Sequence, residues 1–305
     1  MPTDSNPMQE FFERIGHRTY RTETAWWYEV WPRAVLSFPY HRLLEPDRSE
    51  IDRLIRDHRI KVVRYPTPLE AFGFPNTLEV QTDAAFDLGR LDREARRQTR
   101  QGLKQCTFGR IGFDDLATRG LEMNRATAER QGRETIYCDA DYWRRYCEAG
   151  KATEGVRAWG VMVEGKLGSY LVDIAFDGWS NWHLVHSLAE LLPKRPNNVL
   201  FYEATRQFLA AGYKVCYGLG SLENTGSLDR FKVNMGVTVL AIKNRLILSG
   251  KARLAARLTP GPALALVARL FPKSYTVRKG VALLQQYRGQ FSGEPPQQPA
   301  DAGAT

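Results

Sequence analysis

One stretch of the chain, residues 156–187, constrains the fold more than any other. It contains three runs of bulky, β-prone side chains, separated by turns at Glu164–Gly168 and Phe176–Ser180. The second turn includes the dipeptide Asp177-Gly178, which favours a tight β-hairpin. We therefore expect three consecutive antiparallel strands, and this excludes a Rossmann fold, in which strands and helices alternate strictly.

The flanking segments extend this pattern into a sheet with helices packed on it. Residues 199–212 place apolar side chains on one helical face, with Pro196 before the helix and Gly212 closing it. From residue 107 onward the predicted order is strand, helix, helix, three strands, helix, strand, short helix and strand. The fold class that follows is α/β in the broad (α+β) sense, with a mixed, mainly antiparallel sheet flanked by helices.

The N-terminal third gives weaker patterns. Residues 24–40 alternate bulky and β-prone side chains and predict strands, residues 45–60 have helical spacing, and residues 61–66 predict a short strand. Residues 1–15 are expected to be mobile.

A basic face runs along the helix predicted over residues 91–105. Arg93, Arg97, Arg100 and Lys104 recur at helical spacing, beside a packing face that begins at Leu91. A solvated stripe on a surface helix is the simpler explanation, and contact with phosphate groups or another polyanion is the functional alternative.

Positive charge is concentrated toward the C-terminal end. Residues 230–292 contain twelve Lys or Arg and no Asp or Glu, whereas the rest of the chain contains 31 basic and 34 acidic residues. A solvated basic face would produce such an asymmetry, but the complete absence of acids over this length favours an anionic partner. The same region predicts basic amphipathic helices that are broken at Pro260–Pro262.

The sequence also indicates a compartment. The N-terminus has acidic residues and no apolar stretch of the kind found in secretory signals, and the longest apolar run, Ala263–Ala268, is too short to span a bilayer. The four cysteines are widely spaced and form no CxxC motif, which is typical of reduced core residues. We expect a cytoplasmic protein.

Standard phosphate and metal motifs do not fit. Gly220 and Gly226 are one residue too far apart for a Walker loop, and Glu223 replaces the third glycine of a dinucleotide fingerprint. His183 and His186 should point to opposite faces of a strand, and no nearby cluster completes a ligand set, so no metal site is expected. No GxSxG nucleophile motif is present either.

One combination of motifs resembles a known family. The residues that carry the resemblance lie between 186 and 236 and are Pro196-Asn197, Gly212-Tyr213, Gly220-Ser221 and Phe231-Lys232 followed by Gly236. They resemble the FemAB-like branch of the GNAT acyltransferases over roughly residues 90–245, and the basic helix 91–105 resembles the helix that precedes the catalytic domain in this branch. The resemblance implies a GNAT-like sheet, with room for two GNAT-like halves.

The resemblance also implies a division of the chain. Residues 1–105 would form a degenerate N-terminal half that ends in the basic helix, and residues 106–246 the acyltransferase domain. Residues 247–290 would form a basic helical extension, and residues 291–305, which are rich in Pro, Gln and Ala, a disordered tail.

The acyl donor stays open at this point. Acetyl-CoA-dependent GNAT proteins usually carry a glycine-containing loop whose backbone amides hold the pyrophosphate, and here residues 191–198 contain no glycine. FemAB-like proteins commonly lack that loop. Acyl-CoA, aminoacyl-tRNA and an acyl carrier protein all remain possible donors.

The resemblance implies which residues carry the chemistry. Acyl transfer to an amine needs a neutral amine, a polarised carbonyl and close approach, without a covalent nucleophile. Lys232 is the first candidate, because in relatives this lysine is linked to charge neutralisation near the transferred group, and Asp229 and Glu203 are candidate bases. The candidates for binding donor or acceptor are Arg97, Arg100, Tyr170, His186, Asn197, Ser221, Arg230 and Phe231.

We therefore expect a FemAB-like N-acyltransferase that acts on an amino group of an envelope precursor, a glycan or a related metabolite. Its expected partners are the acyl donor, the amine acceptor and an anionic membrane surface at the inner face of the membrane, contacted through residues 247–289. No DNA partner is expected. The alternative is a non-catalytic protein of the same fold that binds RNA or another polyanion.

Overall fold

The computed structural model describes residues 6–130, 132, 135–220, 227–271 and 274–292. The strands are β1 (Thr19–Arg21), β2 (Trp26–Trp31), β3 (Ala34–Phe38), β4 (Val62–Thr67), β5 (Phe74–Gln81), β6 (Cys106–Arg110), β7 (Val156–Val163), β8 (Lys166–Phe176), β9 (Trp179–Ser187), β10 (Lys214–Leu219) and β11 (Thr238–Leu248). The α-helices are α1 (Pro7–Arg14), α2 (Arg48–Asp57), α3 (Arg93–Leu103), α4 (Phe113–Arg130), α5 (Ala140–Ala152), α6 (Pro196–Ala210), α7 (Ser227–Asn234), α8 (Gly250–Leu258), α9 (Gly261–Leu270) and α10 (Tyr275–Ser292). Short 3₁₀ helices are η1 (Leu88–Arg90), η2 (Ile136–Cys138) and η3 (Ala189–Lys194).

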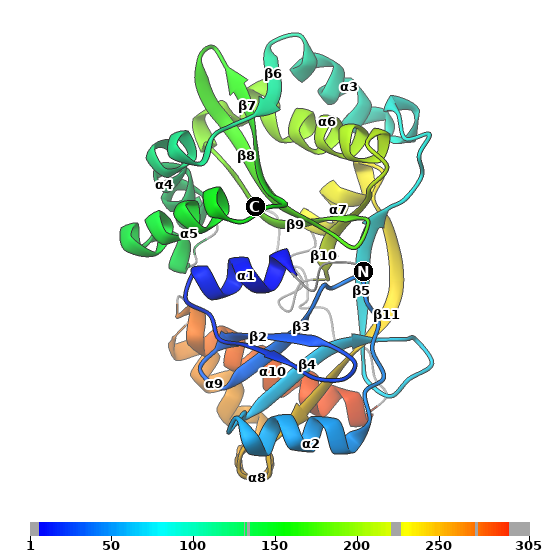
Figure 1. Ribbon diagram of the computed structural model, residues 1–305, viewed down its shortest axis with the longest axis vertical. Coiled ribbons are helices and arrows are strands. Elements are labelled where there is room, and N and C mark those ends of the chain that lie inside the picture. Colours follow the sequence, from blue (N-terminus) through cyan, green and yellow to red (C-terminus); the bar gives the residue numbers. More distant parts are fainter. Residues whose placement is uncertain (1–5, 131, 133–134, 221–226, 272–273, 293–305) are drawn as a thin grey trace.

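Within these residues, eleven strands form one sheet in the order β1-β2-β3-β4-β11-β5-β10-β9-β8-β7-β6 (Figure 1). Only the pairs β3/β4 and β9/β10 are parallel. The predicted mixed, mainly antiparallel sheet flanked by helices is therefore confirmed, and the predicted order of elements from residue 107 onward is the observed one.

The antiparallel hairpins form at the predicted turns. Glu164-Gly165 and Asp177-Gly178 all have positive φ, between 51° and 80°, as the tightest hairpin turns require. Asp and Gly adopt this conformation more easily than most residues, so the sequence Asp177-Gly178 correctly predicted the second turn.

The same supersecondary unit occurs twice in the chain. In each case a parallel strand pair is joined by a helical crossover, α2 between β3 and β4 and α6 between β9 and β10. Both units belong to one continuous sheet, because β11 lies between β4 and β5, and β5 pairs with β10.

Helices cover both faces of the sheet. Residues of α1, α4 and α5 form one core with β8, and residues of α6 form another core on the opposite face of the strands β7 to β10. In the N-terminal part, α2 packs on one side, and α8 and α10 pack on the strands β4 and β11.

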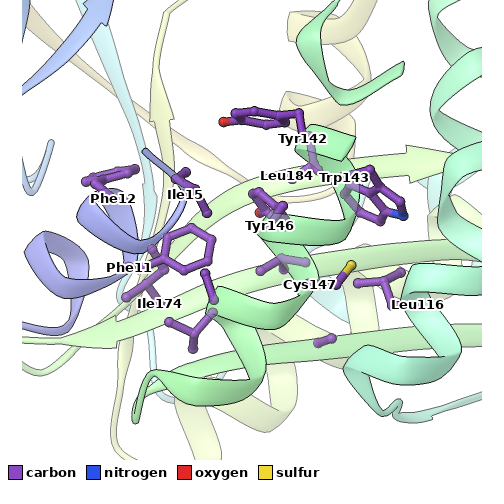
Figure 2. Packing of buried hydrophobic residues seen from close by; sticks show 14 of the residues in the cluster. Phe11, Phe12, Ile15, Leu116, Tyr142, Trp143, Tyr146, Cys147, Ile174 and Leu184 are labelled. Atoms are coloured by element: carbon purple, nitrogen blue, oxygen red, sulfur yellow. The ribbon is translucent and has the colours of Figure 1, made fainter. Parts of the chain in front are cut away.

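The expectation that residues 1–15 are mobile is wrong for the described part, residues 6–15. α1 is a capped helix, because the Asn6 side chain accepts hydrogen bonds from the Met8 and Gln9 amides. Phe11 and Phe12 are fully buried, and Figure 2 shows them among the core side chains of α5 and β8. Sequence periodicity did not reveal this, since only tertiary contacts stabilise so short a helix.

The C-terminal helices form as predicted, with the break between α8 and α9 at Pro260. The Gln290 side chain of α10 bonds the backbone N–H and C=O of Leu246, at 3.3 and 2.9 Å, on the side of β11 where β5 has already ended. α10 therefore completes a sheet edge. Among the described residues, no helix combines the length and apolar character needed to cross a bilayer.

Replacing Phe12 by Ala should lower the free energy of unfolding by about 3–5 kcal/mol. The Phe12 ring stacks on Tyr28 with a centroid distance of 4.1 Å, so truncation leaves a cavity between α1 and β2. Chemical denaturation measures the loss, with the exposed Glu13→Ala on the same helix as control. Wild-type stability in Phe12→Ala would contradict the docking of α1.

Candidate active site

β9 and β10 lie side by side only at one end. They pair over three residues, Trp179–Asn181 with Lys214–Cys216. Beyond this point β9 continues along β8 while β10 continues along β5. A cleft of about 490 Å³ opens at the separation. The backbone groups on the open edge of β9 have no strand partner among the described strands, so they can pair with a ligand.

Aromatic rings line one side of the cleft. The centroid of Trp182 lies 4.8 Å from that of Phe201 and 4.6 Å from that of Tyr217. Phe231 meets Phe201 edge-on at 5.1 Å. The Tyr217 hydroxyl and Thr205 Oγ1 are 2.6 Å apart, which satisfies both polar groups inside an apolar wall.

Lys232 also lines the cleft, and its ammonium forms a hydrogen-bonded ion pair with Glu79 of β5. The Lys232 side chain is 15% exposed and the Glu79 side chain 3%. A carboxylate this deeply buried requires a cation beside it. The pair thus fixes an ammonium group at the boundary between the core and the cleft.

The end of α7 explains why the Phe231-Lys232 motif is followed by a glycine, Gly236. The Val237 N–H donates to Lys232 O and the Gly236 N–H to Val233 O, at 3.1 and 2.9 Å, which is a Schellman stop. Gly236 has a φ of +82°, and a Cβ there would lie 3.1 Å from Arg90 O. Only glycine fits, and it ends α7 one turn after Lys232.

Glu79 is not among the site residues predicted from the sequence. Pro75 and Asn76 near the start of β5 are more typical of a loop than of a strand, so the strand was not predicted there. The sequence pattern that indicates a strand is the alternation of apolar and polar residues after Asn76. Leu78 and Val80 belong to one apolar cluster, and Glu79 lies between them.

A hydrogen-bond chain fixes His186 at another side of the cleft. Asn124 Nδ2 donates to Tyr137 O at 2.9 Å, so Asn124 Oδ1 is the acceptor of that amide. Oδ1 lies 2.6 Å from His186 Nδ1 and also accepts from the Tyr170 hydroxyl. Because a carbonyl oxygen only accepts, the network assigns the ring proton to Nδ1, and in the neutral ring Nε2 carries the lone pair.

The prediction that His183 and His186 point to opposite faces is wrong. The register of β8 and β9 shifts between Trp182 and Leu184, so His183 is the extra residue of a β-bulge. Its Nδ1 lies 2.8 Å from the Tyr146 hydroxyl of α5, on the face where His186 meets α4. Among the described residues, no group of three His, Cys, Asp or Glu side chains is arranged to hold a metal ion.

Polar groups gather around Ser187, where β9 ends at the cleft. Arg130 Nη2 and Asn197 Nδ2 each donate to Ser187 Oγ at 3.3 Å, and Thr127 Oγ1 donates to Ser187 O at 3.1 Å. Asn197 Oδ1 is buried with no hydrogen-bond partner among the described residues. Asn197 belongs to the first turn of α6, so a cation and a helix N-terminus meet at this point.

None of the four cysteines has the lowered pKa of a reactive nucleophile. Burial raises the pKa of Cys216 to about 12 and that of Cys147 to about 12. Burial also raises the pKa of Cys106 and of Cys138. At neutral pH the reactive thiolate form is therefore scarce at every cysteine.

No family model matches the chain, and no curated protein matches it. Solved structures do. A crystal structure of FemX is 10% identical, covers 83% of this chain and 93% of its own, and has a TM-score of 0.58. The C-terminal domain of a chain described as a lysylphosphatidylglycerol synthetase from Agrobacterium fabrum is 13% identical, covers 83% and 91%, and has a TM-score of 0.55. L-PGS from Bacillus licheniformis is 14% identical, covers 81% and 91%, and has a TM-score of 0.52.

The chain therefore shares the fold of FemX and of the lysylphosphatidylglycerol synthetase domain. Within this fold, four of the predicted site residues line the cleft: His186, Asn197, Phe231 and Lys232. Tyr170 lies behind His186, fully buried.

The structure does not bring the other predicted residues to the lining of this cleft. Glu203 pairs with Arg206 at 2.7 Å, and Arg97 pairs with Glu94 at 2.6 Å on the surface of α3. Arg100 on α3 and Arg230 on α7 are exposed. Ser221 and the side chain of Asp229 lie outside the described residues.

Acidification should lower the free energy of unfolding, because His183 is buried as a neutral ring. Burial, with a smaller effect of nearby His17, lowers the pKa of His183 to about 4, so the folded chain keeps this ring neutral while the unfolded chain protonates it near pH 6.5. This contribution to stability is complete above pH 6.5 and falls by about 3 kcal/mol as the pH drops to 4.

Denaturation of wild type and His183→Gln between pH 4 and 7 measures this difference. The variant should lose less stability than wild type over the window, and His58→Gln, at an exposed position, should behave like wild type. Parallel curves for wild type and His183→Gln would disprove the assignment.

Proposed function

We propose that this protein is a FemAB-like N-acyltransferase that transfers an acyl or aminoacyl group to an amino group of an envelope precursor, a glycan or a related metabolite. The observation that carries the proposal is the cleft between β9 and β10, lined by Lys232, His186 and an aromatic wall. Its volume of about 490 Å³ suits the transferred group and the adjoining part of a donor.

In the proposed reaction the acceptor nitrogen attacks the carbonyl carbon of a donor ester or thioester. A C–N bond forms, the C–O or C–S bond to the carrier breaks, and the amine proton ends on the leaving oxygen or sulfur. The step requires proximity, a stabilised oxyanion and a proton relay. It requires no covalent enzyme intermediate, in keeping with cysteines whose pKa values burial raises.

Lys232 would stabilise the oxyanion. Its ammonium is held by Glu79 and is largely shielded from water, and an oriented charge in such a site acts more strongly on a developing negative charge than it does in bulk water. Because the ion pair exists before any donor arrives, little reorganisation is needed during the reaction.

His186 would take the proton from the amine and return it to the leaving group. The Asn124 amide oxygen accepts from Nδ1–H, so Nε2 is the nitrogen that would gain and lose the proton. Tyr170 shares the same Asn124 oxygen and acts as a positioning residue. His186 thus takes the role of general base for which Asp229 and Glu203 were the candidates in the sequence.

We propose an aminoacyl-tRNA as the donor, with acyl-CoA as the alternative. The mouth of the cleft combines Arg130 with the N-terminus of α6, which suits a phosphate. α3 packs close to the same helix end, since a Cβ on Gly102 would lie 3.1 Å from Arg195 O, so its cations extend the positive surface beyond the reach of a small donor. The related fold of a lysylphosphatidylglycerol synthetase supports an aminoacyl group.

Removing the Lys232 charge should abolish most transfer without unfolding the protein, provided that Glu79 is neutralised as well. Lys232→Met alone leaves a buried carboxylate unpaired and should also destabilise the fold. The double variant Lys232→Met/Glu79→Gln should melt near wild type and transfer 100- to 1,000-fold more slowly, roughly the effect of losing one oxyanion donor.

The assay uses labelled lysyl-tRNA, alanyl-tRNA and acetyl-CoA with amine acceptors, and Arg206→Gln as a surface control. A folded double variant that retains wild-type rates would overturn the role of Lys232. Thermal stabilisation by bare tRNA, without transfer from any donor, would instead establish the non-catalytic alternative.

His186→Gln should lower kcat by about 100-fold or more, because general-base catalysis is lost while the donor site remains. KM for the donor should stay close to the wild-type value. Steady-state kinetics with varied donor concentration test this. An unchanged kcat in the variant would assign the proton transfer to another group.

A further inference from the structure

α8 and the α9 region expose an unusual number of large apolar side chains. Six of them are between 39% and 73% exposed, and they are Leu254, Leu258, Leu266, Val267, Leu270 and Phe271. Single exposed apolar residues are common, but several on consecutive helices mark an interaction surface.

On α8 the side chains are sorted into stripes. Ala256 is buried against the core, whereas Leu254 and Leu258, four residues apart, lie exposed on one side of the helix. Arg253 and Arg257 form a parallel exposed stripe. An exposed apolar stripe beside a basic stripe is the pattern of a helix that lies in a membrane interface.

A cationic groove of about 700 Å³ lies beside α8. It is lined by Arg33 from the β2–β3 turn, Arg59 and Lys61 from the turn after α2, and Lys251 in the first turn of α8. None of its described lining residues is an Asp or Glu. Three of these four cations lie in the N-terminal third, far from the acid-free segment in sequence, so only the fold brings them together.

Two acids lie near this groove in sequence. Asp57 pairs with Arg56 at 3.0 Å, and the Glu29 carboxylate accepts a hydrogen bond from the Arg33 amide. Neither acid lines the groove, whose four cations make it complementary to an anion such as a phosphate group.

We infer that this end of the molecule docks on a bilayer of anionic lipids. The leucines of α8 and α9 enter the interface, and the groove formed by Arg33, Arg59, Lys61 and Lys251 receives lipid phosphates. The inference takes up the anionic membrane surface expected from the sequence and adds residues outside 247–289. It rests on the proposed function only for the identity of the soluble donor.

Charge favours a bilayer over the other candidate occupants. A second copy of this chain, docked through the same surface, would bring the groove and the arginine stripe against identical cations. Nucleic acid would match the cations but leave the leucines exposed to water. An anionic bilayer satisfies both features at once.

The inferred docking also sets an orientation. α3 and α6 lie at the opposite end of the long axis from α8 (Figure 1). With α8 on the bilayer, the cations of α3 point toward the cytoplasm, where a soluble donor such as tRNA can reach them.

The test is co-sedimentation of the full chain with vesicles, either of phosphatidylcholine alone or of phosphatidylcholine mixed with phosphatidylglycerol. We expect binding only to the mixed vesicles, and weaker binding at high salt. The triple variant Arg59→Ser/Lys61→Ser/Lys251→Ser should bind roughly a hundredfold more weakly. Leu258→Glu/Leu270→Glu should not bind.

The matched control removes the same number of charges from the far end, as Arg93→Ser/Arg97→Ser/Arg100→Ser. It should bind vesicles like wild type, which separates docking from attraction by net charge. All these side chains are exposed, so thermal melting should confirm that each variant is folded.

Three results would overturn the inference. One is no binding of wild type to phosphatidylglycerol vesicles at low salt, and another is equal weakening by the α3 variant and the groove variant. The third is a dimer that Leu258→Glu/Leu270→Glu converts to a monomer, which would assign the surface to a second copy. Transfer to a soluble acceptor is assayed separately, so failure of docking and failure of the proposed chemistry are distinguishable.

Discussion

β9 and β10 separate after three paired residues, and the candidate active site forms where they part. Parallel neighbours in a sheet interior satisfy each other's backbone groups, and an unpaired group buried in protein is costly. Here the pairing of β9 with β10 ends after three residues. Beyond that point β10 continues to pair with β5, and β9 continues to pair with β8. The backbone groups on the open edge of β9 then have no strand partner among the described strands, and water or a ligand in the adjoining cleft can satisfy them.

Strands from distant parts of the sequence meet near that cleft. β5 belongs to the N-terminal part of the chain, yet it lies between β10 and β11 and brings Glu79 to Lys232. Glu79 and Lys232 are 153 residues apart, so the N-terminal part of the chain supplies the buried carboxylate that holds the proposed oxyanion-stabilising ammonium.

Much of the fold could be predicted from the sequence, because the patterns that indicate it involve residues close together in the chain. Hairpin turns, helix ends and the glycine after Lys232 each act over a few residues. The omissions all depended on distant partners. α1 is held by the burial of Phe11 and Phe12, and Glu79 is 153 residues from Lys232. The bulge at His183, which turns two histidines to one face, adds a residue without breaking the run of β-prone side chains.

Hydrogen–deuterium exchange shows whether the transferred group enters between β9 and β10. The measurement compares the free protein with the protein bound to a non-hydrolysable aminoacyl-tRNA analogue. We expect slower exchange in residues 182–187 of β9 and in α7, beyond any protection on α3 that deacylated tRNA also produces. Protection confined to α3, with β9 unchanged, would contradict it.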